Sequence, residues 1–202
     1  KIMKKKNRIN TTKQSETNIK NQLTDYSVKN NNSIIYLIIV FCLPVLLYLQ
    51  TINFGYTYFD DDSIIIKNIS FLGNIKNAGQ VFLTDAFINN SSSFYRPMQT
   101  LSFMTDILFS GGSHAWMYHL TNVFLIGMIS CLLFILLIRF HIPLRLALLG
   151  TLIYCIHPLF VSSVAWLPGR LFFFFIFFAL LSFISFVEYQ KKGENKYLIF
   201  NC

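Results

Sequence analysis

Three consecutive carboxylates, Asp60, Asp61 and Asp62, follow an apolar stretch of the chain by about ten residues. They stand out because the sequence of 202 residues holds only nine acidic side chains. A carboxylate near a membrane surface can act as a general base and remove the proton from an acceptor hydroxyl group. Two simpler interpretations stay open: the three acids form a solvated loop, or they cap a short helix that follows.

Other polar side chains near the predicted membrane boundaries suit a negatively charged substrate. Cationic and hydrogen-bonding groups stabilise the charge that develops on a leaving phosphate. Each also has a simpler interpretation: an arginine in a turn at headgroup level, an interfacial histidine, an asparagine that joins two helices, or an arginine that snorkels. These residues are Arg96 in "FYRP", His119 and Asn122 in "HLTN", His157 in "HP" and Arg170 in "WLPGR".

The composition is that of a membrane protein. Hydrophobic residues make up 54% of the chain and charged residues 13%, with a mean hydropathy of +0.51, whereas soluble domains average about 25% charged residues. The net charge is +8, but eight of the 17 basic residues lie in the first 29 positions. A cationic tail beside anionic lipid explains this distribution better than a nucleic-acid partner.

Four apolar segments are long enough to cross a membrane. They cover about residues 34–54, 115–138, 146–166 and 171–188, and a fifth apolar run begins before Cys202. The sequence therefore predicts an all-α polytopic membrane protein of the multi-pass type, and we expect it to be a fragment. The four cysteines lie in apolar surroundings without a CxxC pair, which predicts neither a disulfide framework nor a zinc site.

Lysine and arginine placement predicts the orientation of these spans. Basic residues gather in the tail, residues 1–32, in the turn after the second span and in the segment after the fourth. The positive-inside rule then places a disordered basic tail in the cytosol and the long loop, residues 55–113, on the outer or luminal side. We expect a bacterial cytoplasmic membrane, or the endoplasmic reticulum if the protein is eukaryotic.

The long loop is predicted to carry juxtamembrane helices. Met98, Leu101, Met104 and Leu108 recur at helical spacing after a proline that suits a first turn, and two glycines end the pattern. This predicts an amphipathic helix on the outer interface. A second, weaker segment surrounds Val81, Phe82 and Phe87.

Four motifs in order resemble the membrane glycosyltransferases of the GT-C class, and specifically the TMTC-like O-mannosyltransferases and their bacterial relatives that often carry tetratricopeptide repeats. The motifs are "FDDDSIIIKN", "FYRPMQTLSF", "YHLTNVFL" and "HPLFVSSVAWLPGR", and the resemblance covers about residues 34–190 of a membrane domain that spans residues 33–202. It implies inverting transfer of a sugar from a polyprenyl-phosphate donor to a protein or glycan acceptor on the outer or luminal face.

The resemblance also assigns roles to individual residues. Its acidic pair falls on Asp60 and Asp61, either of which would be the base. Its donor-phosphate and substrate positions fall on Arg96, His119, Asn122, His157 and Arg170. No cofactor is required. A divalent cation stays possible because carboxylates suit hard cations, but three adjacent acids do not define a coordination site, so we assign no metal ligand.

Three departures from the family pattern leave an alternative open. Ser162 and Phe172 stand where relatives often have acidic residues, and Ile126 replaces a histidine. These replacements fit either a divergent substrate site or a non-catalytic scaffold or assembly protein of the same fold. A transporter is the weakest interpretation, because its ionisable groups would sit near the midplane of broken helices rather than at one face.

Overall fold

The computed structural model describes residues 31–88 and 92–193, and within them every regular element is a helix. The predicted basic tail up to residue 30 and the predicted start of a fifth span lie outside the described residues. The elements, in chain order, are α2 (Asn31–Tyr48), η1 (Leu49–Asn53), α3 (Asp60–Ile64), η2 (Ile66–Asn68), α4 (Ile69–Leu72), η3 (Ile75–Leu83), α5 (Pro97–Ser110), α6 (Ala115–Arg139), α7 (Leu144–Cys155), α8 (Leu159–Ala165), η4 (Leu167–Gly169) and α9 (Arg170–Lys192).

Three helical segments of the described chain are long and apolar enough to span a membrane: Ser33–Asn53, Ala115–Arg139 and Leu167–Lys192. They match the first, second and fourth predicted spans. The third predicted span is not one straight helix, because α7 and α8 bend by 61° at their junction. Pro158 lies at this break and has no backbone N–H to continue the helical hydrogen bonds of α7. Within residues 31–88 and 92–193, the number of candidate spans is four only if the bent pair crosses as one.

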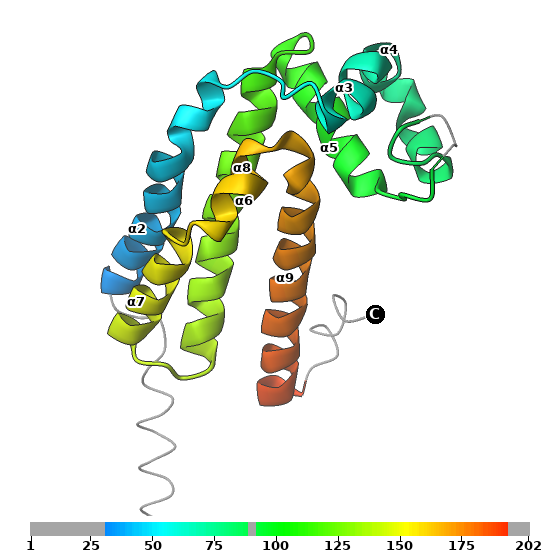
Figure 1. Ribbon diagram of the computed structural model, residues 1–202. Coiled ribbons are helices and arrows are strands. Elements are labelled where there is room, and N and C mark those ends of the chain that lie inside the picture. The colour runs from blue at the N-terminus through cyan, green and yellow to red at the C-terminus, as the bar shows by residue number, and fades with distance from the viewer. Residues whose placement is uncertain (1–30, 89–91, 194–202) are drawn as a thin grey trace, which may run out of the picture.

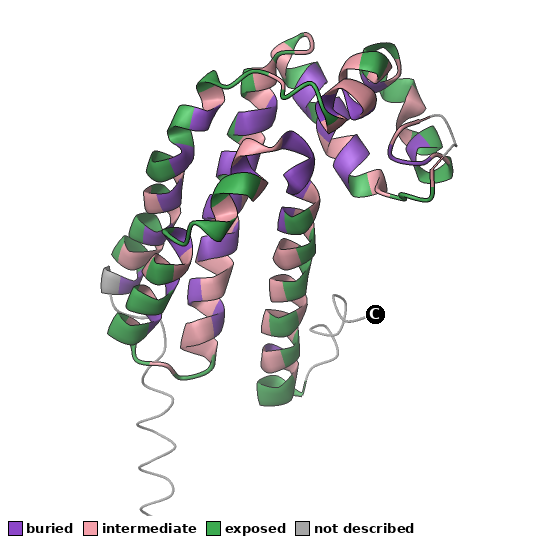
Figure 2. Cartoon of the chain, in the orientation of Figure 1, coloured by how far each residue is buried: buried purple, intermediate pink, exposed green. Residues whose placement is uncertain are grey.

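Helix α6 forms the centre of the bundle and packs against α2, α7, α8 and α9 (Figure 1). Helix α2 approaches it closely at Gly127, where a Cβ atom would lie 2.9 Å from the ring of Phe41. Buried residues line α6, whereas most of α9 beyond its first turn is half-buried or exposed (Figure 2). Phe175 of α9, for example, is 74% exposed. The apolar surface of α9 thus remains available to lipid or to further protein.

The long loop folds into a packed helical unit at one end of the bundle, which we call the loop end (Figure 1). One buried apolar cluster joins α3, α4, η3 and α5 to the first turn of α6 and to η4. Its buried members are Ile64, Ile65, Leu72, Val81, Phe103, Met104, Ile107, Tyr118 and Leu167. The helices α3 and α6, which carry Asp60, Asp61, His119 and Asn122, therefore share one core, and His157 lies outside it.

Helix α5 confirms the helix predicted after residue 97. Pro97 occupies its first turn, and Gly111 ends it with a φ of 70°, a conformation that favours glycine. The apolar residues predicted to share one face of this helix are not all buried. Met104 is buried, whereas Met98 and Leu108 are exposed. The weaker segment around Val81 forms the 3₁₀ helix η3, which ends at Leu83.

Candidate functional site

The three adjacent carboxylates have three different environments at the start of α3. Asp60 is half-buried and, among the described residues, makes no hydrogen bond or ion pair. Asp61 is fully buried. Asp62 pairs with Nζ of Lys67 at 2.6 Å. Of the three, Asp60 is therefore the carboxylate that is both accessible and unengaged.

A short turn fixes the position of Asp60. The backbone N–H and the hydroxyl of Thr57 both donate to Oδ2 of Asp61, each at 2.8 Å. The turn that they close places Tyr58 at a φ of 55°, which is uncommon for a residue other than glycine. Tyr58 and Phe59 are pushed outward and are 78% and 77% exposed. Asp61 thus anchors a constrained turn, and Asp60 follows it at the helix start.

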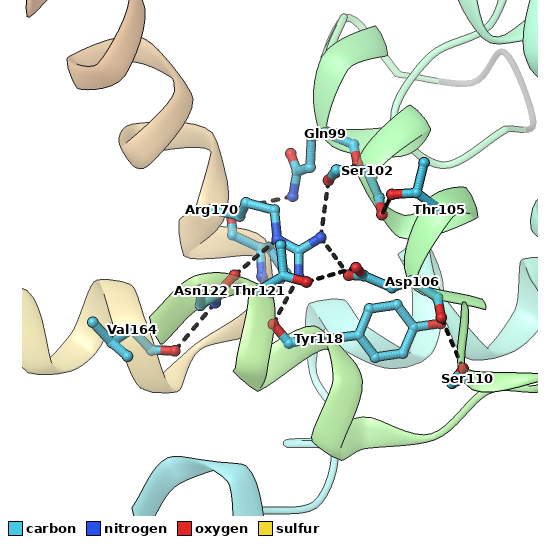
Figure 3. A network of polar contacts seen from close by, with 11 residues as sticks. Gln99, Ser102, Thr105, Asp106, Ser110, Tyr118, Thr121, Asn122, Val164 and Arg170 are labelled. Carbon is cyan, nitrogen blue, oxygen red and sulfur yellow. Dashed lines mark hydrogen bonds and ion pairs between the residues drawn. The ribbon is translucent and has the colours of Figure 1, made fainter. Parts of the chain in front are cut away.

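Arg170 lies at the centre of a buried polar network at the loop end (Figure 3). Its side chain is 0% exposed. Nε donates to Oδ1 of Asn122 at 2.8 Å, and Nη2 donates to the carbonyl of Tyr118 at 2.7 Å. Nη1 donates to Oδ2 of Asp106 at 2.6 Å and to Oγ of Ser102 at 2.9 Å. Each of its three nitrogens thus has a protein partner, so in this arrangement Arg170 does not face a substrate phosphate.

Asp106 is the buried counter-ion of Arg170, and none of the sequence motifs includes it. Its Oδ1 accepts a hydrogen bond from the hydroxyl of Thr121 at 2.6 Å. Burial raises the pKa of the Asp106 carboxyl group, while the charge of Arg170 and the bond from Thr121 act to lower it. One signal was available, because Asp106 is the only charged residue in α5. We call Ser102, Asp106, Tyr118, Thr121, Asn122 and Arg170 the Arg170 network.

The "WLPGR" segment is compact because Gly169 lies against the preceding helix. A Cβ atom at this position would lie 2.7 Å from the carbonyl oxygen of Ser163. Gln99 donates to the carbonyl of Pro168 in this segment at 3.2 Å, and Asn122 donates to the carbonyl of Val164 in the preceding helix α8 at 3.1 Å. This close packing brings the first residue of α9 into the network.

Arg96 and His157 are the predicted phosphate-binding residues that stay accessible. Arg96 is half-buried next to the start of α5, with Cζ 5.0 Å from the ring centre of Phe94. Among the described residues its guanidinium group has no ion pair. His157 is exposed, and its Nδ1 accepts the N–H of Leu159 at 3.2 Å. A neutral His157 ring therefore carries its proton on Nε2, which is then a free donor.

His119, in contrast, is fully buried. Its ring contacts Phe54 edge to face, with the centroids 6.1 Å apart. Neither ring nitrogen makes a hydrogen bond to a described residue. The structure thus brings Asn122 and Arg170 into direct contact and encloses His119, but no hydrogen bond or ion pair within the described residues joins Arg96 or His157 to the acidic residues.

The three departures from the family pattern lie in different surroundings. Ser162 is exposed, and Phe172 is 55% exposed on α9. Ile126 is 0% exposed in an apolar cluster with Tyr48 and Val123. Within the described ranges, no three His, Cys, Asp or Glu side chains converge on one point that a metal ion could occupy.

Comparison with known proteins identifies the relatives of this chain. It is 31% identical over 156 residues, 68% of the chain, to "Protein O-mannosyl-transferase TMTC4" from Mus musculus. It is 33% identical over 133 residues, 63% of the chain, to "Protein O-mannosyl-transferase tmtc2" from Xenopus laevis, and equally to "Protein O-mannosyl-transferase Tmtc1" from Drosophila melanogaster. No protein-family model matches the chain, and no solved structure matches it significantly.

The matches cover only part of each relative. The aligned region is 21% of the mouse protein, 16% of the frog protein and 15% of the fly protein. The similarity and the three long apolar helices support an integral membrane location. Over about two thirds of its length, the chain is a homologue of the TMTC protein O-mannosyl-transferases.

Proposed function

We propose that this chain belongs to an inverting GT-C glycosyltransferase that transfers a sugar from a polyprenyl-phosphate donor to a hydroxyl group on a protein or glycan. The reaction takes place on the outer or luminal face, where the long loop lies, and the amino terminus is cytosolic. The names of its relatives support the transfer of mannose to protein. A bacterial cytoplasmic membrane, or the endoplasmic reticulum of a eukaryote, is the proposed location.

The observation that carries this proposal is the environment of Asp60. It is accessible and unengaged among the described residues, and the bonds from Thr57 to Asp61 hold the turn before it in place. In the proposed reaction, the Asp60 carboxylate takes the proton of the acceptor hydroxyl. The acceptor oxygen bonds to the anomeric carbon, the bond from that carbon to the phosphate oxygen breaks, and polyprenyl phosphate leaves. A single displacement of this kind inverts the anomeric centre.

Arg96 and His157 are the proposed phosphate-binding residues. Both are accessible, and each offers a donor that no described residue occupies: the guanidinium group of Arg96 and Nε2 of His157. Such donors stabilise the negative charge that grows on the leaving phosphate. Exposed apolar side chains on α8 and α9 provide a surface for the lipid tail. Arg170 and Asn122 do not bind the donor in this proposal. They hold the helices that carry the site in place through the buried Arg170 network.

The test is sugar transfer by the full-length protein in membranes, supplied with a labelled polyprenyl-phosphate sugar. We expect the double variant Asp60→Asn and Asp61→Asn to lose transfer while the protein still accumulates in the membrane. Unchanged transfer by this variant would overturn the assigned mechanism.

A non-catalytic scaffold of the same fold is the second candidate. Ile126 favours it, because this residue is buried in an apolar cluster at a position where the family resemblance implies a histidine. This candidate predicts no sugar transfer by the wild-type protein. It also predicts that the carboxylate variants keep whatever assembly the protein supports, whereas the transferase predicts that they lose turnover.

A further inference from the structure

We infer that Asp106 is a positioning residue of the proposed transferase: through Arg170 it holds helix α5 of the long loop in register with the membrane helices α6 and α9. The inference rests on the proposed function for its effect on turnover. Its structural part can be measured without any substrate.

The Arg170 network joins parts of the chain that are far apart in sequence. Asp106 and Arg170 are 64 residues apart, and Arg170 and Asn122 are 48 apart. Asp106 and Ser102 come from α5, Tyr118, Thr121 and Asn122 from α6, and Arg170 from the first position of α9 (Figure 3). A contact that includes all three helices fixes the position of α5 relative to both others.

Burial makes this contact specific. The side chains of Arg170 and Asp106 are 0% and 3% exposed in their ion pair. A buried charge without a partner is costly, so α5 cannot slide along α9 and leave the guanidinium group unpaired. Phe103 of α5 adds a second restraint, because Cζ of Arg170 lies 4.8 Å from its ring centre. The network therefore favours one placement of α5.

That placement also determines where the proposed reacting groups lie. Arg96 directly precedes the first residue of α5. Ile64 of α3, four residues after Asp60, shares the buried cluster with Phe103 and Met104 of α5. A shift of α5 would therefore move the phosphate-binding arginine directly and the helix of the proposed base through its packing. Small displacements of this kind lower turnover strongly.

The experiment compares three variants of the full-length protein in lipid nanodiscs. Asp106→Leu removes the carboxylate and keeps a branched side chain with the same number of heavy atoms, whereas Asp106→Asn keeps the shape and one oxygen acceptor. Thr105→Leu is the matched control, because Thr105 is an exposed neighbour on the same helix. Hydrogen exchange of the α5 amides measures how readily the backbone hydrogen bonds of this helix open, and sugar transfer per folded molecule measures kcat and KM.

We expect Asp106→Leu to increase exchange in α5 while the central part of α6 stays protected. We expect its kcat per folded molecule to fall roughly 10- to 100-fold. Asp106→Asn should give an intermediate loss of both, and Thr105→Leu should match wild type. If the Asp106→Leu protein does not accumulate in the membrane, Asp106→Asn becomes the deciding variant, and it is judged by α5 hydrogen exchange and by kcat.

Wild-type kcat or wild-type α5 exchange in the deciding variant would overturn the inference, as would an equal loss in Thr105→Leu. A wild-type protein that transfers no sugar would instead overturn the proposed function. In that case increased α5 exchange in the Asp106 variants would still establish the structural contact.

Discussion

The carboxylate of Asp106 lies 2.6 Å from Nη1 of Arg170, and this buried pair joins the long loop to the first turn of α9. The two residues differ in whether they can become neutral when the other is removed. A buried carboxyl group can take up a proton, and burial already raises the pKa of Asp106. An arginine stays charged under all ordinary conditions. The pair is therefore asymmetric.

This asymmetry predicts unequal effects of two apolar substitutions. Asp106→Leu should destabilise the protein by about 3–5 kcal/mol, because it leaves a permanent charge buried and unpaired. Arg170→Met also removes the donors to Asn122 and to the Tyr118 carbonyl. Because its unpaired Asp106 can take up a proton, its loss of stability should shrink as the pH falls, whereas that of Asp106→Leu should not. Thermal unfolding of the purified variants in one detergent measures the difference. A loss in Arg170→Met that stays unchanged as the pH falls, or a loss in Asp106→Leu that shrinks to the same extent, would show that the charges of this pair do not determine the stability of the network.

The hydroxyl of Thr57 should stabilise the turn before Asp60. Thr57→Val removes the hydroxyl bond to Asp61 and keeps the backbone N–H bond. The free energy of unfolding should fall by about 1.5 kcal/mol, because the acceptor is charged. Thr57→Ser retains the hydroxyl and is the control, which should remain close to wild type in the same thermal assay. A serine variant as unstable as the valine variant would exclude the hydroxyl bond as the cause.

Gly169 should tolerate no larger residue. A Cβ atom there would lie 2.7 Å from the carbonyl oxygen and 2.9 Å from Cα of Ser163, both of which are backbone atoms. Gly169→Ala should therefore cost about 1–3 kcal/mol of stability. The matched control is Gly79→Ala, since nothing lies within 4 Å of a Cβ at that position. Thermal unfolding that does not distinguish the two alanine variants would contradict the close packing of η4 on α8.

The proposed orientation can be tested by labelling single cysteines. A cysteine introduced at the exposed position Gly79 in the long loop should react with a membrane-impermeant maleimide added to intact cells. A cysteine at the exposed position Arg145, in the first turn of α7 at the opposite end of the bundle, should react only after the membrane is permeabilised. The cysteine-free parent protein gives the background. The reverse pattern would show that the positive-inside assignment is wrong.

Local signals in the sequence predicted several elements correctly. Helix α5 follows from a proline at its start, a helical apolar spacing and a glycine that can adopt a φ of 70° at its end. The first, second and fourth spans follow from long segments with few charges. The bend at Pro158 did not follow from the sequence, because a proline alone does not determine how far two helix segments bend.

The long-range contacts could not be predicted from one sequence. Asp106 is visible as a lone charge in α5, but nothing local identifies a partner 64 residues away. Arg170 was assigned to the phosphate by resemblance, whereas the structure surrounds it with protein acceptors. The acidic residues 60–62 are equivalent by composition. Their environments differ because α3 begins at Asp60 and because Thr57 donates its hydrogen bonds to Asp61 rather than to Asp60 or Asp62.

The most direct test of the central claim compares Asp60→Asn with Asp62→Asn in the full-length protein. Each variant removes one negative charge from the same helix, but only Asp60 is proposed to take the proton of the acceptor. Transfer from a labelled polyprenyl-phosphate sugar, per folded molecule, should fall by about 10²- to 10⁴-fold in Asp60→Asn and stay near wild type in Asp62→Asn. Wild-type turnover in Asp60→Asn would contradict the account.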